Sequence, residues 1–187
     1  MSCGRLEVRD GFLVLIAALW FVDEAGVMPL FLLAAAVHEG GHLLVLYLSG
    51  GRLHRLTLTL CGAVIRCTLP EGRCARAAVC LAGPAASFLL AAGAMKGGFF
   101  TLAGASVLLG AFNLLPMQPL DGGMALYHLA DGGLVLLRGL FGAGTALLLF
   151  GGGAWLAWQG GGIWLLLIGA LTAGQEGKTL AKSRNWV

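Results

Sequence analysis

Two histidines and a glutamate within five residues offer the clearest chemistry in this sequence: His38-Glu39-Gly40-Gly41-His42. On a helix, residues four apart lie on one face, so both imidazoles can reach a single metal ion. Glu39, beside the first histidine, is then placed to hold and deprotonate a water molecule at that ion. The pattern predicts zinc-dependent hydrolysis. The competing interpretation is a polar cluster that hydrogen-bonds between helices.

A catalytic zinc takes a third protein ligand and keeps one position open for water. Three side chains later in the chain qualify, namely Asp121, His128 and Asp131. Asp121 follows a stretch in which Pro116 and Pro119 cannot continue a helix. Such irregular backbone is tolerated at membrane depth only where it is buried in protein or lines a watery cavity. We expect Gly122 and Gly123 to permit a sharp backbone that aims the Asp121 carboxylate inward.

The elements that would position these side chains are membrane helices. Of 187 residues, 58% are hydrophobic and only 11% are charged, whereas a soluble domain carries roughly 25% charged residues. The net charge of +3 comes from scattered basic residues, so nucleic-acid binding has no support. The 5 cysteines include no CxxC pair, which argues against a disulfide framework.

The sequence predicts an all-α polytopic membrane protein: one domain over residues 1–187, with about six transmembrane helices and a small membrane-associated β-hairpin. The hairpin is expected at 52–69, because Leu56-Thr57-Leu58-Thr59-Leu60 alternates with the period of a strand. The expected spans are 11–22, 27–49, 75–95, 99–115, 134–150 and 155–173.

Lys and Arg residues in short loops set the orientation of membrane proteins. With six spans, all of the 12 Lys and Arg residues except Lys96 and Arg138 fall on one side. We therefore expect both termini in the cytoplasm and the protein in a bacterial cytoplasmic membrane. About 10 Å of helix separates His42 from Ser49, which puts the metal nearer the cytoplasmic face.

The HEGGH segment, together with NLLPMQPLDGG at 113–123, resembles the site-2 protease family of intramembrane zinc metalloproteases. The compact six-span layout is most similar to the subgroup that processes a sporulation sigma-factor precursor in spore-forming bacteria. The resemblance implies that His38, His42 and Asp121 bind Zn²⁺. It also implies that Glu39 is the catalytic carboxylate and that Asn113 helps to hold the substrate or the developing oxyanion.

Two positions depart from the family pattern. The third span of the family often reads G-P-x-x-N, whereas here Gly83-Pro84-Ala85-Ala86 is followed by Ser87. An Arg often follows the glycine pair of the second motif, where this chain has Met124. Many members also carry a PDZ or CBS domain. Neither is expected here, so ATP sensing through a CBS domain is not expected either.

The leading prediction is an intramembrane zinc endopeptidase that cleaves a membrane-associated or transmembrane protein near the cytoplasmic face. Its partners would be that substrate, the lipid bilayer and separate regulatory membrane proteins, without nucleic acid. An edge strand of the hairpin would pair with an unwound substrate, unless the hairpin is only a connector at the membrane surface. Two other functions compete: an inactive relative that binds membrane segments, and a transporter whose cluster binds the transported ion.

Overall fold

The computed structural model describes residues 2–3, 6–59, 62–117 and 120–130, together with isolated residues between 144 and 159. Within this part the chain is mostly helical, with five helices and one small sheet. It divides into two compact units, Met1–Phe112 and Asn113–Val187. Most of the fifth and sixth predicted spans lies outside the described residues.

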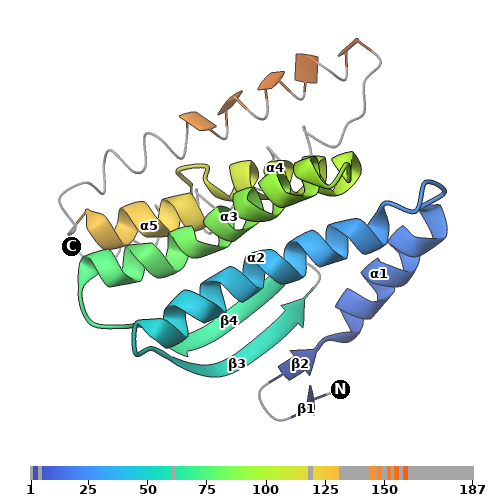
Figure 1. Ribbon diagram of the computed structural model, residues 1–187. Coiled ribbons are helices and arrows are strands. Elements are labelled where there is room, and N and C mark those ends of the chain that lie inside the picture. The colour runs from blue at the N-terminus through green and yellow to red at the C-terminus, as the bar shows by residue number, and fades with distance from the viewer. Residues whose placement is uncertain are drawn as a thin grey trace. The chain divides into compact units, whose positions relative to one another are not determined.

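The first two helices are α1, Asp10–Val22, and α2, Met28–Leu48 (Figure 1). Each begins and ends within one residue of the predicted span. Asp23 fixes the junction between them, because its two carboxylate oxygens accept hydrogen bonds from the backbone N–H groups of Val27, at 2.9 Å, and Met28, at 2.7 Å. These groups lie at a helix start, where no helical carbonyl can pair them.

The next two helices are α3, Arg73–Lys96, and α4, Phe100–Asn113. With 24 residues, α3 is about 36 Å long, enough to cross a hydrocarbon core about 30 Å thick. It continues through Pro84, as predicted. Among the described helices, α2 and α3 are long and apolar enough to span a membrane, while α4 and most of α1 form shorter apolar helices.

The predicted hairpin is present as β3, Arg52–Thr59, and the antiparallel β4, Gly62–Thr68. It belongs to a larger sheet, because β1, Ser2–Cys3, and β2, Leu6–Val8, extend it to the order β1-β2-β3-β4. The prediction of a hairpin alone was therefore incomplete: strands of two and three residues are too short for their alternation to be recognised. Among the described strands, β3 lies between β2 and β4, and β1 and β4 form the two edges.

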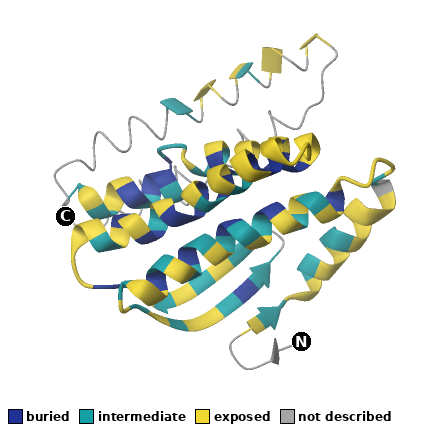
Figure 2. Cartoon of the chain, in the orientation of Figure 1, coloured by how far each residue is buried: buried dark blue, intermediate teal, exposed yellow. Residues whose placement is uncertain are grey.

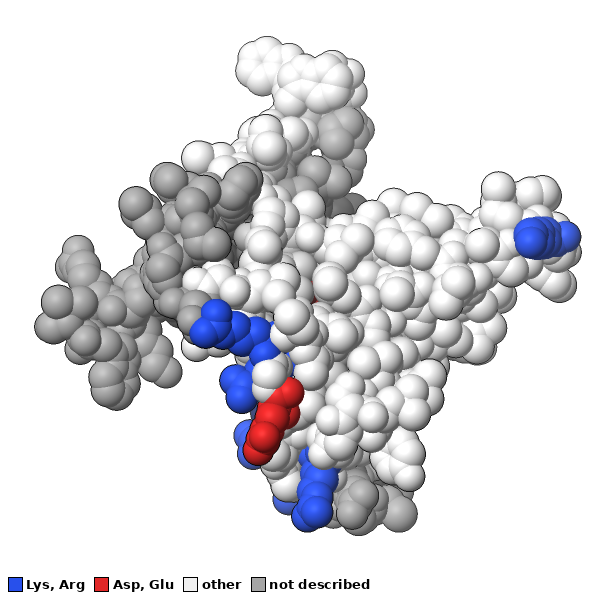
Figure 3. All heavy atoms as spheres, turned by 60° about the vertical axis from the view of Figure 1, so that its left-hand side comes forward, with Lys and Arg blue, Asp and Glu red and all other residues white. Residues whose placement is uncertain are grey.

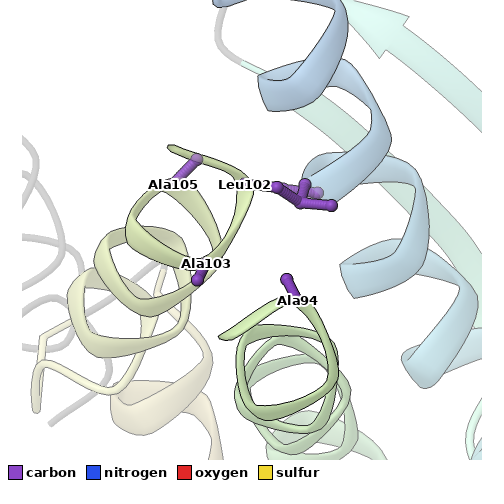
Figure 4. Packing of buried hydrophobic residues seen from close by; sticks show 5 residues of the cluster. Ala94, Leu102, Ala103 and Ala105 are labelled. Carbon is purple, nitrogen blue, oxygen red and sulfur yellow. The ribbon is translucent and has the colours of Figure 1, made fainter. Parts of the chain in front are cut away.

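The first unit is held together where α2 packs against α3 (Figure 2). We call this contact the α2–α3 seam. On each helix a row of four buried residues recurs every four positions, which keeps the row on one face. On α2 they are Ala34, His38, His42 and Leu46, and on α3 they are Val79, Gly83, Ser87 and Ala91. At one end of the seam, residues of α4 complete an apolar cluster of Ala34, Ala94, Leu102, Ala103 and Ala105 (Figure 4).

The outer surfaces of the helices carry large apolar side chains, such as Phe21 at 92% exposure and Leu89 at 74%. Extensive exposed apolar surface marks a site of contact with lipid or protein. Exposed basic side chains lie near the two ends of α3. Lys96 is its last residue, and exposed arginines gather at its start and on β3 and β4. These arginines are Arg52, Arg55, Arg66, Arg73 and Arg76. In Figure 3 the surface between the cationic ends is almost uncharged, as expected for a segment surrounded by lipid.

Candidate metal centre

The two histidines of the HExxH segment lie on the same face of α2 and are buried, with 4% exposure for His38 and 8% for His42. Their Nε2 atoms are 3.3 Å apart. A tetrahedral zinc ion with Zn–N distances of about 2.0–2.1 Å holds two imidazole nitrogens about 3.3–3.4 Å apart. The spacing of this pair therefore fits two ligands of one zinc ion.

The other ring nitrogens of both histidines are hydrogen-bonded to α3. The Nδ1 atom of His42 lies 2.7 Å from the carbonyl oxygen of Val79. A carbonyl can only accept, so Nδ1 carries the proton and the lone pair of this ring lies on Nε2. The Nδ1 atom of His38 lies 2.9 Å from Oγ of Ser87, and with the hydroxyl accepting, His38 adopts the same tautomer. Such outer partners are typical of histidines that bind a metal.

Two glycines make room for this arrangement. A Cβ atom on Gly83 would overlap the imidazole ring of His42. A Cβ atom on Gly41 would lie 2.6 Å from the carbonyl oxygen of Ala82, closer than real Cβ contacts. By contrast, a Cβ atom on Gly40 would meet nothing within 4 Å. The two glycines of the HEGGH segment therefore differ: Gly41 sets the close approach of α2 to α3, and Gly40 does not.

Glu39 and Asn113 are both described, and each is half-buried. Glu39 lies on α2 directly after His38, within the candidate span. Asn113 is the last residue of α4, two residues before the predicted end of that span, and it begins the second unit.

Asp121 is the first residue of α5, Asp121–Leu129, in the second unit, and it is half-buried. The prediction that Gly122 and Gly123 form a sharp backbone was wrong, because both lie in the first turn of this helix. Their small size matters instead. A Cβ atom on Gly122 would overlap the carbonyl oxygen of Leu114, so glycine lets the non-helical segment after α4 pack against the start of α5.

The other predicted candidates occupy different settings. His128 is half-buried on α5, with its ring edge-on to Tyr127 at a centroid distance of 5.4 Å. His54, which is not one of those candidates, is exposed on β3 and hydrogen-bonds through Nε2 to Oγ1 of Thr68 at 2.7 Å, so it is a solvated hairpin residue. Asp131 lies outside the described residues.

Within the described part of the chain, His38, His42 and Asp121 each offer one ligand atom of a kind that could hold a metal ion. Two imidazoles and a carboxylate suit zinc and leave a fourth position for water. Among the cysteines whose side chains the structure describes, Cys67, Cys74 and Cys80 form no disulfide bond. Burial raises the pKa of the Cys67 thiol, which keeps it protonated at neutral pH and disfavours it as a metal ligand.

Sequence reasoning missed the contribution of α3. It treated Ser87 as a departure from the family pattern, and a backbone carbonyl such as that of Val79 has no signature in a sequence. One signal was available: Val79, Gly83 and Ser87 recur every four residues, as do the two histidines opposite them. Two antiparallel helices whose small or polar residues share this period can pair position by position.

Comparison with known proteins identifies a fold. No family model and no curated protein sequence matches this chain. Its structure is similar to a solved structure, the site-2 protease from Methanocaldococcus jannaschii, with a TM-score of 0.68 and 20% sequence identity. The match covers 95% of this chain and 92% of the other. The chain therefore has a fold like that of a site-2 protease, and with two candidate spans it has the character of a membrane protein.

Proposed function

We propose that this protein is an intramembrane zinc metalloendopeptidase. The observation that carries the proposal is the histidine pair on a candidate membrane span, with Nε2 atoms 3.3 Å apart and both Nδ1 atoms bonded to α3. A polar cluster that only joined two helices would not need two ring nitrogens directed toward one point. The fold likeness to a site-2 protease supports the same conclusion.

Asp121 is the proposed third ligand. Its carboxylate would join the two imidazole nitrogens of His38 and His42, since each of the three residues offers one ligand atom, and together they would make a donor set typical of catalytic zinc. When bound, zinc would polarise the scissile carbonyl and lower the pKa of a water molecule to about 7. The non-helical segment between α4 and α5 would allow the Asp121 carboxylate to reach the two histidines.

Glu39 is the proposed general base and acid. Its carboxylate would take the proton of the attacking water and then pass it to the leaving amine. Asn113 would donate an amide N–H to the oxyanion that develops on the substrate carbonyl. Both roles need a side chain that reaches the reaction centre from a helix already fixed in place, which suits their positions on α2 and at the end of α4.

The proposed substrate is a membrane-associated or transmembrane protein cut near the cytoplasmic face. A sporulation sigma-factor precursor is the specific substrate that the subgroup resemblance implies. In this proposal the protein lies in a bacterial cytoplasmic membrane with both termini in the cytoplasm, and separate membrane proteins regulate it. The exposed arginines on β3, β4 and the start of α3 support that orientation.

The strand β4 is the proposed place where the substrate becomes extended. A helical substrate hides its amide groups in internal hydrogen bonds, so it must unwind before it is cut. An extended segment can then add to a sheet edge through main-chain hydrogen bonds. Of the two hairpin strands, β3 lies between β2 and β4, so the hairpin strand at an edge of the described sheet is β4.

The experiment measures zinc content and cleavage of co-expressed membrane-associated candidates in the same preparations. Wild type should bind about one zinc ion and cut. Glu39→Gln should keep zinc and lose cleavage, while Asp121→Ala should lose zinc. The matched control is Glu71→Gln, which changes an exposed glutamate in the loop before α3 and should behave as wild type. If Glu39→Gln cuts as well as wild type, the proposed mechanism is wrong, and the cluster is an ion-binding or structural site.

A further inference from the structure

We propose that Ser87 is a positioning residue of the metal site, whose hydroxyl accepts the Nδ1 proton of His38 and so directs Nε2 of that ring toward the zinc ion. The proposal rests on the proposed function, because it assumes that the histidine pair binds zinc. Its first support is geometric: Oγ of Ser87 lies 2.9 Å from Nδ1 of His38, and both residues are buried, with exposures of 0% and 4%.

The comparison between the two histidines shows why the Ser87 hydroxyl matters. His42 is oriented by the main-chain carbonyl of Val79, which accompanies any residue at that position. Nδ1 of His38 is hydrogen-bonded instead to a side-chain hydroxyl, that of Ser87. Loss of that hydroxyl would remove the acceptor that Ser87 offers to a buried N–H donor, which is costly in a low-dielectric interior.

The surroundings of Ser87 hold its side chain in place. A Cβ atom on Gly110 of α4 would lie 3.1 Å from Cβ of Ser87, so the backbone of α4 approaches it closely from one side. His38 of α2 lies on its hydroxyl side. A short side chain between two helices has little freedom to reorient, so the acceptor is fixed before a metal ion arrives. Preorganisation of this kind raises the affinity of a site.

Burial alone does not explain a serine at this position. Ser106 on α4 is equally buried, at 0% exposure, but its hydroxyl donates to the carbonyl oxygen of Leu102 in the same helix at 2.8 Å. Ser106 therefore satisfies its own polar group within one helix, while Ser87 contacts a candidate ligand on another. The two serines form a natural test pair, matched in type, burial and helical setting.

The experiment compares Ser87→Ala with Ser106→Ala in the full-length protein in detergent micelles. Zinc affinity is measured by competition with a chelator, and the imidazole groups are observed by ¹⁵N NMR of zinc-loaded, histidine-labelled protein, which has only 4 histidines. Ser87→Ala should weaken zinc binding about 10- to 100-fold, the range for loss of an outer partner. It should also speed solvent exchange of the Nδ1 proton of His38 but not of His42. Ser106→Ala should leave both properties unchanged.

A rescue series separates positioning from packing. Ser87→Thr keeps the hydroxyl, and Ser87→Asn supplies an amide oxygen, so at least one of them should restore zinc affinity to within about threefold of wild type. The proposal is overturned if neither does, or if Ser87→Ala matches Ser106→Ala in both affinity and proton exchange. Failure of the proposed function is a different result: wild type itself would bind no zinc.

Discussion

The two ends of the α2–α3 seam use similar small residues for different purposes. At one end, Ala34 and Ala94 pack with Leu102 of α4, and nothing but apolar side chains lies in the buried cluster. At the other end, His38 and His42 occupy the α2 face, and small residues of α3 make room for their rings. Close packing lets helices associate in lipid, and the same closeness brings outer partners within hydrogen-bonding distance of the histidines.

The comparison teaches that the site needs no special backbone: on the buried face of a regular helix, histidines stand where small apolar residues stand at the other end of the seam. Both α2 and α3 run unbroken through the two ends of the seam, so neither helix needs to break to hold the histidines. Stability and metal binding should therefore be separable. Changes at the apolar end should lower the free energy of unfolding, and changes at the histidine end should lower zinc affinity.

The largest effect should come from Gly83→Ala. The added Cβ atom would overlap the ring of His42, which must leave its position. Loss of a direct ligand exceeds the 10- to 100-fold cost of losing an outer partner, so zinc affinity should fall by about 1,000-fold, or about 4 kcal/mol. Competition with a chelator measures the change.

Gly93→Ala is the matched control for Gly83→Ala. Gly93 lies on the same helix, and its added Cβ atom would meet nothing within 4 Å. This variant should keep full zinc affinity and gain up to about 1 kcal/mol in helix stability. Equal zinc affinity in the two variants would contradict the close contact between Gly83 and the imidazole ring of His42.

The second effect should appear at the apolar end. Leu102→Ala removes a side chain with 8% exposure from the cluster that Figure 4 shows. The lost packing should lower the free energy of unfolding by about 3 kcal/mol, as measured by reversible unfolding in mixed micelles. Zinc affinity of the folded protein should stay within about twofold of wild type. A large loss of affinity would mean that the two ends of the seam are coupled.

Sequence reasoning recovered the elements that have strong periodicity. The helices α2 and α3 and the β3–β4 hairpin were predicted because an apolar run long enough to cross a membrane and a strand alternation both leave clear local signals. The HExxH pair was predicted to share one helix face, and the structure confirms it with the 3.3 Å approach of His38 and His42.

What the sequence left open depends on contacts between distant segments. The partners of the histidine Nδ1 atoms lie 37 and 49 positions further along the chain, and one of them is a backbone group. The short strand β2 forms because β3 offers it an edge, and β1 pairs in turn with β2, which is not a property of their own residues. Gly122 shows a third limit: a glycine required for close packing reads in a sequence like one required for a turn.

The third effect separates the two glycines of the HEGGH segment. Gly41→Ala should push α2 away from the α3 backbone, since the added Cβ atom would lie 2.6 Å from the carbonyl oxygen of Ala82. We expect a loss of about 2 kcal/mol in unfolding free energy from overpacking, together with weaker zinc binding. Gly40→Ala, whose added Cβ atom meets nothing within 4 Å, should leave both within experimental error or raise stability. Similar behaviour of the two variants would contradict the close approach at Gly41.

The smallest effect should follow Ala91→Ser, which places a hydroxyl four residues beyond Ser87 on the same buried face of α3. A buried serine in a helix can satisfy its hydroxyl on a carbonyl of its own helix, as Ser106 does with Leu102, at little cost to the helix. We therefore expect a change of about 0.5 kcal/mol or less in unfolding free energy and no change in zinc affinity. If Ala91→Ser altered zinc binding as much as Ser87→Ala, the effect of Ser87 would reflect the polarity of the seam and not its hydrogen bond to His38. If Ala91→Ser left zinc affinity unchanged while Ser87→Ala lowered it, the effect would come from the hydrogen bond between the Ser87 hydroxyl and the His38 imidazole.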